Sequence, residues 1–192
     1  MSYFSFLADF PVWAGLLIAL VTCATMELTA YSVHRWIMHG PLGWGWHRSH
    51  HEPHDDMLEE NDLYAVVFAV LAIALFWVGA NHATWVWWIG VGVSLYGVLY
   101  FCAHDGLVHQ RWPFRYVPRR GYLQRLYQAH KLHHAVDGRD GCVSFGFLYT
   151  PPVRVLKEQL KAGEEARRGN AAFATERARG GADKARAKRA AV

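Results

Sequence analysis

Three long apolar stretches restrict the folds open to this chain of 192 residues. They cover residues 11–33, 63–80 and 83–103, and Glu27 is the only charged residue within them. About 20 apolar residues suffice to cross a bilayer as a helix, so each stretch is a candidate membrane span, and the last two form a tight hairpin. As buried helices of a soluble protein, the three stretches would have too little polar surface to cover them. We therefore expect an all-α integral membrane protein with three transmembrane helices.

Lys and Arg are distributed unevenly along the chain, and their placement predicts its orientation. Of the twenty, only Arg35 and Arg48 precede Arg111, and none lies before the first span or between the second and third. Because Lys and Arg favour the cytoplasmic side, we expect the segments after the first and third spans, and the C-terminus, to be cytoplasmic. The expected location is the cytoplasmic membrane.

Ten of the twelve histidines fall into a pattern that occurs twice: a pair five positions apart, followed by His-x-x-His-His. The first copy comprises His34, His39, His47, His50 and His51, and the second comprises His104, His109, His130, His133 and His134. Between the copies, both pair members shift by 70 positions and all three triplet members shift by 83. Chance seldom repeats such a pattern, so we interpret the ten histidines as one metal centre.

The number of spans decides whether the two copies can meet. The first and third spans run in the same direction, so His34 and His104 are expected to emerge on the same face of the membrane. The two triplets follow on that face. If residues 63–80 did not cross the membrane, the two copies would lie on opposite sides.

The histidine spacings indicate how the centre is built. In a helix, residues at i, i+3 and i+4 share a face, so each His-x-x-His-His triplet can direct its imidazoles toward one point. Five residues advance an ideal helix by about 500°, which leaves the members of each pair about 140° apart. Either the helix loosens at its cytoplasmic end, or each member approaches a different metal. Divided over two ions, ten histidines give up to five ligands each, and imidazole suits iron, zinc, copper and nickel.

Acidic residues near the histidines are candidates to orient the imidazole rings by accepting hydrogen bonds. These candidates are Asp105, Asp137, Asp140, Asp62 and Glu52. An acid within a span, such as Glu27, is a functional candidate, although a neutral glutamic acid with a hydroxyl partner is also consistent with the sequence.

The two remaining histidines do not fit the pattern. His82 is in the turn on the opposite face and is excluded, and His54 is out of phase and expected at the surface. Four aromatic residues near the site either anchor the membrane interface or line a substrate channel. They are Trp44, Trp46, Trp112 and Phe114.

The other segments are shorter or polar. Glycines and a proline between residues 40 and 45 are expected to end the first helix and turn the chain back. Residues 119–135 read as an amphipathic helix, and the apolar segment 144–153 is too short to span, so it packs at the interface or in the core. The tail beyond residue 157 is expected to be disordered or loosely helical. The three cysteines lack a metal-binding spacing and are expected to form neither a disulfide nor a metal site.

Between residues 106 and 136 the chain carries six basic residues and no acid. This charge either reflects topology and contact with lipid headgroups or docks an acidic electron-transfer protein. Nucleic-acid binding is not expected on a membrane surface.

The histidine pattern on a membrane scaffold resembles the fatty acid hydroxylase and sterol desaturase superfamily of non-haem di-iron oxygenases. Over most of residues 27–152 the resemblance is to bacterial β-carotene 3-hydroxylases. It is carried by HRWIMHGPLGWGWHRSHHEP, NDLYAVVFAV, HDGLVHQRWPFRYVPRRGYLQRLYQAHKLHHA and GCVSFGFLYTPP. The resemblance implies a membrane-embedded catalytic domain over residues 1–156, followed by a basic low-complexity tail over residues 157–192.

The resemblance also implies a reaction. Two non-haem iron ions, held by the ten histidines, would use O₂ and electrons from reduced ferredoxin to hydroxylate C3 of β-ionone rings. β-Carotene from the lipid phase would become β-cryptoxanthin and then zeaxanthin. The alternatives are a carotenoid ketolase or lipid hydroxylase of the same superfamily, a histidine-rich metal transporter, and a membrane haem protein. A transporter would place histidines near the middle of its spans, whereas these lie at one end.

Overall fold

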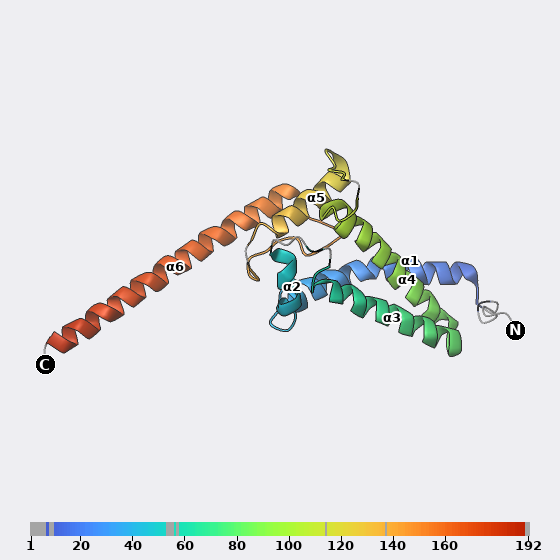
Figure 1. Ribbon diagram of the computed structural model, residues 1–192, viewed down its shortest axis with the longest axis horizontal. Helices are drawn as coiled ribbons and strands as arrows, with labels where there is room; N and C mark the ends of the chain where they lie inside the picture. Colours follow the sequence, from blue (N-terminus) through green and yellow to red (C-terminus); the bar gives the residue numbers. More distant parts are fainter. Residues whose placement is uncertain are drawn as a thin grey trace.

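The structure, a computed structural model, describes residues 7, 10–52, 56, 58–113, 115–136 and 138–190, with side chains as far as residue 175. Throughout these ranges the regular elements are helices (Figure 1). In chain order they are α1 (Val12–Ser32), the π-helix η2 (Val33–Met38), α2 (Trp44–His51), α3 (Asp62–Asn81), α4 (Thr84–Tyr100), the π-helix η3 (Phe101–Val108), α5 (Gly121–His133) and α6 (Val153–Ala190).

Three helical segments are long and apolar enough to cross a membrane: Val12–Met38, Asp62–Asn81 and Thr84–Val108. They confirm the three predicted spans, and the first and third are longer than predicted because η2 and η3 continue α1 and α4. Large apolar side chains on α1 and α3 face outward, as expected for contact with lipid. Examples are Leu16, Leu17, Leu20, Val66, Val67 and Val70. The chain is an all-α membrane protein.

Helix α4 is the centre of the bundle because it packs against both α1 and α3. Lipid provides no hydrophobic force to hold helices together, so close packing through small residues matters more than it does in water. Gly92 of α4 is one such position, since a Cβ there would lie only 2.6 Å from the carbonyl oxygen of Ala19 in α1. The core between the helices contains Met26, Ala30, Ala72, Val93 and Tyr96.

The two π-helices explain how the two members of each histidine pair can lie on the same side of a helix. In a π-helix each N–H donates to the carbonyl five residues earlier. His39 N donates to His34 O at 3.0 Å, and His109 N donates to His104 O at 2.9 Å. The ring centroids are 5.2 Å apart in the first pair and 4.5 Å apart in the second. Of the two alternatives for the pairs, loosening of the helix end is confirmed.

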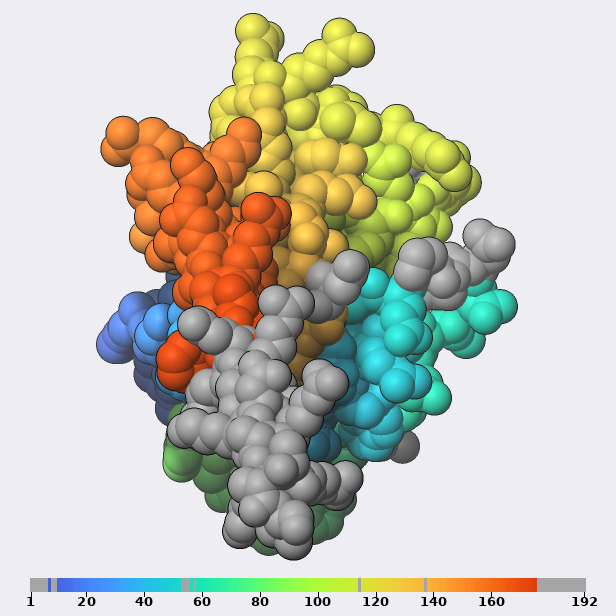
Figure 2. Space-filling model, turned by 90° about the vertical axis from the view of Figure 1, so that its left-hand side faces the viewer, coloured from blue at the N-terminus to red at the C-terminus, as the bar shows by residue number. Residues whose placement is uncertain are grey.

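The ends of α1 and α4 that carry the π-helices lie together, as the count of spans predicts, and α2 and α5 gather around them (Figure 1). Figure 2 shows this end of the molecule. The surface there is formed by α2 in cyan, the segment around α5 in yellow and α6 in orange. The predicted amphipathic helix is confirmed as α5, which packs against α6 through Ala129 and Leu156. Of the two forms expected for the tail, the structure shows a helix, because α6 is continuous as far as Ala190. Phe145 of the apolar segment is buried in the core.

Candidate metal centre

Eight of the ten patterned histidines form two groups in which the ring nitrogens lie within 4.8 Å of one another. The first histidine group is His34, His39, His47 and His133. The second histidine group is His50, His104, His109 and His130. The last two histidines lie between the groups, with their rings stacked at 4.5 Å. His51 Nε2 is 3.3 Å from His47 Nε2 in the first group, and His134 Nε2 is 3.0 Å from His130 Nε2 in the second. Each group can therefore draw on five imidazoles.

Each group combines histidines from both copies of the sequence pattern. The first group takes its pair and one triplet member from the first copy, and His133 from the second. The second group takes the equivalent three residues from the second copy, and His50 from the first. His50 and His133 are themselves equivalent, since they are the middle members of the two triplets. The exchange is reciprocal, so separating the two halves of the chain would dismantle both groups.

Hydrogen bonds at Nδ1 fix the tautomers in the first histidine group. His34 Nδ1 donates to Phe145 O at 2.9 Å, His39 Nδ1 to Arg139 O at 2.8 Å, and His133 Nδ1 to Val143 O at 2.9 Å. His47 Nδ1 donates to Asn61 Oδ1 at 2.7 Å. In a neutral imidazole with its proton on Nδ1, Nε2 carries only a lone pair.

Four Nε2 lone pairs in the first group thus point toward a common volume. The distances from His34 to His47, from His47 to His39 and from His39 to His133 are each 3.1 Å between Nε2 atoms. These nitrogens cannot hydrogen-bond to one another, because neither member of a pair has a proton to donate. Buried lone pairs that face each other without a donor need a cation between them.

The separations also have the right size for a metal site. Nearest ring nitrogens in the centre are 3.0–3.3 Å apart. With metal–imidazole bonds of about 2.1 Å, these separations correspond to angles of about 90–105° at the metal, between octahedral and tetrahedral values. The residues present fit a pair of imidazole-bound metal ions.

In the second histidine group, two of the four rings donate to carboxyl groups rather than to amide or carbonyl oxygens. His50 Nδ1 donates to Glu59 Oε1 at 2.9 Å, and His104 Nδ1 donates to Asp105 Oδ1 at 2.7 Å. Arg111 forms ion pairs with Glu59, with Asp62 at 2.9 Å and with Asp105 at 3.8 Å. A carboxylate behind a ligating histidine fixes its orientation and raises its basicity.

Burial keeps the imidazoles outside the spans neutral. Burial, together with the charge of neighbouring histidines, lowers the pKa of His47 to about 3, of His51 to about 4 and of His134 to about 2. It also lowers the pKa values of His130 and His133 well below the usual range. Because metals bind the neutral ring, these histidines are ready to act as ligands at neutral pH.

The structure distinguishes among the acids that the sequence indicated. Asp105 is confirmed as a hydrogen-bond acceptor for a histidine, whereas Asp62 contacts Arg111, and Glu52 pairs with Arg48 at the surface. Asp140 pairs with the neighbouring Arg139 and is exposed. Asp137 and His54 lie outside the described residues. His82 lies beside Trp77, at the end of α3 away from the centre.

Sequence reasoning missed five of the groups that orient the imidazoles. They are the Asn61 amide, the Glu59 carboxylate and the carbonyls of Arg139, Val143 and Phe145. Asn61 and Glu59 lie just before the second span, on the same side of the membrane as the histidines, so their polar side chains could have been predicted as hydrogen-bond acceptors for imidazoles. Backbone carbonyls carry no signal in the sequence.

Cys142 lies close to the first histidine group. Its sulfur is within 4.8 Å of a ring nitrogen of His39, His51 and His133. Its thiol donates to the carbonyl of Gly138 at a distance of 3.6 Å, and burial raises its pKa to about 11. A metal binds the thiolate rather than the thiol, so we leave Cys142 out of the candidate ligands.

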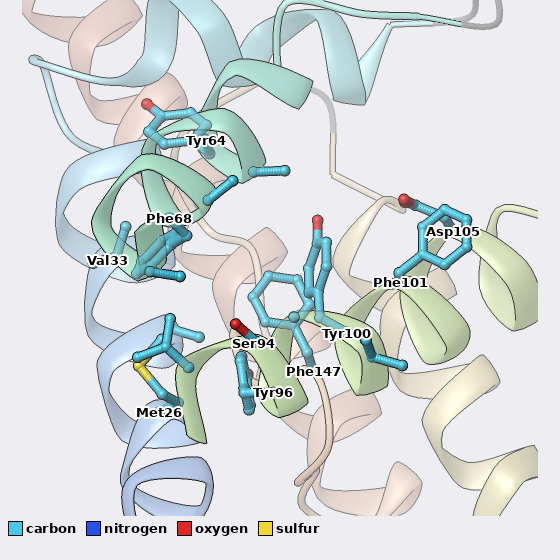
Figure 3. Close-up of a pocket in the computed structure, with 17 residues that line it drawn as sticks. Met26, Val33, Tyr64, Phe68, Ser94, Tyr96, Tyr100, Phe101, Asp105 and Phe147 are labelled. Atoms are coloured by element: carbon cyan, nitrogen blue, oxygen red, sulfur yellow. The ribbon is translucent and has the colours of Figure 1, made fainter. Parts of the chain in front are cut away.

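An apolar cavity of about 390 Å³ adjoins the histidines within the membrane-spanning bundle (Figure 3). Its lining comes from α1, α3, α4 and the two π-helices, with Phe147 from the loop that precedes α6. Tyr100 stacks on His104 with ring centroids 4.6 Å apart, which places the cavity directly beside the centre. Trp44, Trp46 and Trp112 are not among the lining residues, and Phe114 lies outside the described residues. The cavity volume of about 390 Å³ falls within the usual range for small-molecule sites.

Replacing Asn61 by Leu is expected to weaken metal binding at the first histidine group by about 10–100-fold. The Asn61 side chain is buried, and Leu leaves the Nδ1–H of His47 without an acceptor, so the ring loses its fixed tautomer. The measurement is titration of the metal-free protein against a competing chelator. Asn61→Asp keeps an acceptor oxygen and should bind metal nearly as the parent does. Asn81→Leu, at the exposed far end of α3, is the matched control and should change nothing. Equal affinity in all four proteins would contradict this role.

Residues 19–151 match the family model for fatty acid hydroxylases, and the chain belongs to this family. Membership makes it a hydroxylating oxidoreductase. The chain is 71% identical over 145 residues to a β-carotene hydroxylase of Paracoccus sp. (strain PC1), which covers 76% of this chain and 90% of that protein. It is 56% identical over 160 residues to a β-carotene hydroxylase of Pantoea ananas, covering 83% and 90%. A chloroplastic β-carotene hydroxylase 1 from Capsicum annuum is 40% identical over 144 residues, covering 71% and 45%. No solved structure matches the chain.

Proposed function

We propose that this protein is a β-carotene 3-hydroxylase that converts β-carotene to β-cryptoxanthin and then to zeaxanthin. Two non-haem iron ions would be held by the ten patterned histidines, five to each ion. The observation that carries the proposal is the apolar cavity beside the two histidine groups, because it would bring the end of an apolar molecule against the metals. The names of several relatives, which are 56–71% identical, support the choice of substrate.

The proposed reaction consumes one O₂ for each hydroxyl group. A ring C–H, O₂, two electrons and two protons give a ring C–OH and one water. Reduced ferredoxin would supply the electrons one at a time, and the iron pair, when bound, supplies the chemistry that activates O₂. The chain itself would bind the ring in the cavity, hold the metals through neutral imidazoles and keep water away from the centre.

The orientation and the partners are also proposals. The Lys and Arg distribution supports a cytoplasmic position for the histidine centre and the C-terminus. Arg115, Arg119 and Arg120 are exposed before α5, on the segment without acids, which suits docking of an acidic ferredoxin. β-Carotene would enter from the lipid, which also surrounds the spans. We retain the division into a catalytic domain over residues 1–156 and a tail over residues 157–192, although this boundary falls inside α6.

Expression in a bacterial host that accumulates β-carotene tests the proposed function. Chromatography should show β-cryptoxanthin first and zeaxanthin later, and the purified protein should contain about two iron ions per chain, as two imidazole-rich sites require. A ketone product would indicate a carotenoid ketolase instead, and unchanged β-carotene with a hydroxylated lipid would indicate a lipid hydroxylase. Metal-loaded protein that leaves both unchanged would contradict an oxygenase and favour a metal transporter.

A further inference from the structure

Glu27 lies within the membrane-spanning helix α1, and its carboxylate binds a loop that is distant in sequence. Oε1 accepts the backbone N–H groups of Phe147, Leu148 and Tyr149 at 2.9, 3.0 and 2.9 Å. Oε2 accepts the hydroxyl of Tyr96 at 2.7 Å. An acid inside a span is costly unless it is paired, and three successive N–H groups form a nest that suits an anion. Of the two alternatives for Glu27, the hydroxyl partner is present as Tyr96, but both oxygens accept hydrogen bonds, as those of a carboxylate do, rather than donating as a neutral acid would.

The loop requires an unusually close approach of its backbone to this carboxylate. A Cβ at Gly146 would lie 2.7 Å from Glu27 Oε1, so a larger residue would displace the loop. Ser144 adopts a left-handed conformation with φ of 60°, which is uncommon outside glycine. The carbonyls on either side of Ser144 accept the Nδ1–H groups of His133 and His34. The same loop is thus fixed to Glu27 and to the first histidine group.

Phe147 is the point at which this loop reaches the cavity. Its ring stacks on His34 with centroids 5.0 Å apart and planes 12° apart. It also meets His104 edge-on, with centroids 5.3 Å apart, and packs against Tyr100 at 4.7 Å. Phe147 therefore contacts histidines of both groups while it lines the cavity (Figure 3). Its ring thus forms part of the boundary between the cavity and the histidines.

We propose that Phe147 determines which ring carbon of the substrate faces the metal centre, and that Glu27 is the positioning residue that holds Phe147 in place. The inference rests on the proposed function, because it names the side chain that selects C3. Tyr96 lines the cavity and donates its hydroxyl to Glu27, so Glu27 is linked both to the loop and to the cavity surface on which the substrate would lie. Displacing Phe147 would change the depth and tilt of the bound ring without removing a metal ligand.

Amide hydrogen exchange tests the positioning role without any turnover. In Glu27→Ala, the peptide covering residues 144–150 should exchange at least about tenfold faster than in the parent, because three N–H groups lose their acceptor. Glu27→Gln keeps one acceptor oxygen and should exchange at nearly the parental rate. Leu28→Ala is the matched control, since Leu28 is the next residue on α1 and is 70% exposed. Unchanged exchange in Glu27→Ala would overturn the positioning role.

Product analysis tests the specificity role in the same variants. In Phe147→Ala and Glu27→Ala, the ratio of 3-hydroxylated product to other ring-hydroxylated products should fall at least about tenfold, while metal content stays at the parental level. Phe147→Ala should leave exchange at Leu148 and Tyr149 unchanged, because their bonds to Glu27 persist. Leu28→Ala should keep both the parental ratio and the parental rate.

The outcomes separate this inference from the proposed function. If the parent hydroxylates at C3 and active Phe147→Ala keeps the parental ratio, the specificity role is wrong while the proposed function stands. If Glu27→Ala does not fold, Phe147→Leu tests the specificity role of the ring, and Gly146→Ala tests the hold of Glu27 on the loop, because its Cβ would lie 2.7 Å from Glu27 Oε1 and should speed exchange at residues 147–149. If the parent forms no hydroxylated carotenoid, both the proposed function and the specificity role are wrong, while the exchange data still decide whether Glu27 holds the loop.

Discussion

His133→Ala is expected to reduce the formation of hydroxylated carotenoid by at least about 100-fold, because loss of a ligand should exceed the 10–100-fold cost of losing an outer hydrogen bond. His133 is fully buried, with 0% of its surface exposed, and is the only member of the first histidine group that comes from the second copy of the pattern. Its ring packs against those of His34, His39 and His51, so its removal opens the site as well as removing a nitrogen. Product chromatography and metal analysis of the purified protein are the measurements.

The control for this substitution is His82→Ala, which also removes an imidazole but lies at the opposite end of the bundle. It should retain parental activity and metal content. Helical content and elution volume should be the same for both variants and the parent, so that loss of activity is not loss of folding. Full activity and full metal content in folded His133→Ala would remove His133 from the ligand set.

The spans and the meeting of the two histidine copies could be predicted because both depend on properties of single segments. A run of about 20 apolar residues is a local signal, and three such runs determine which ends share a face. The histidine pairs at i and i+5 even indicated the irregular helix ends, since a regular α-helix separates such residues by about 140°. The structure accordingly places a π-helix at each pair.

The division of the histidines between the groups could not be predicted in the same way. His50 and His51 are neighbours in one short helix, yet His50 belongs to the second histidine group and His51 points to the first. Which of them crosses over depends on how α2 is rotated against the ends of α1 and α4. That rotation is set by tertiary contacts, such as the bond from Tyr64 to the carbonyl of Gly43, and not by the spacing of histidines.

The two groups differ in the charge around them, which the symmetry of the sequence pattern does not reveal. Neutral amide and carbonyl oxygens accept the Nδ1–H groups in the first histidine group. Carboxylates of Glu59 and Asp105 do so in the second. Arg111 contacts both carboxylates and so compensates part of their charge. We expect a metal in the second group to meet a more negative environment than one in the first.

This difference leads to the second large effect, for Arg111→Met. In the metal-free protein the substitution should lower the free energy of unfolding by about 3–5 kcal/mol, the cost of leaving a buried charge without its partner. The side chain of Glu59 is only 2% exposed, so its charge would remain in a poorly solvated position. The pair of Arg111 with Asp62 should contribute less to this loss than the pair with Glu59, because Asp62 is 28% exposed and water screens it. Met keeps an unbranched side chain of similar length, which limits the loss of packing.

Loading the protein with metal should reduce the effect of Arg111→Met, because a divalent ion in the second histidine group compensates the carboxylate charge that Arg111 otherwise offsets. The measurement is the shift of the thermal unfolding midpoint in detergent, with and without metal, relative to the parent. Arg48→Met is the matched control: its pair with Glu52 is 63% and 59% exposed, so the midpoint should scarcely move in either state. An equal shift of Arg111→Met in the two states would mean that its carboxylate partners do not act on the metal. No shift in either state would mean that Arg111 does not stabilise them at all.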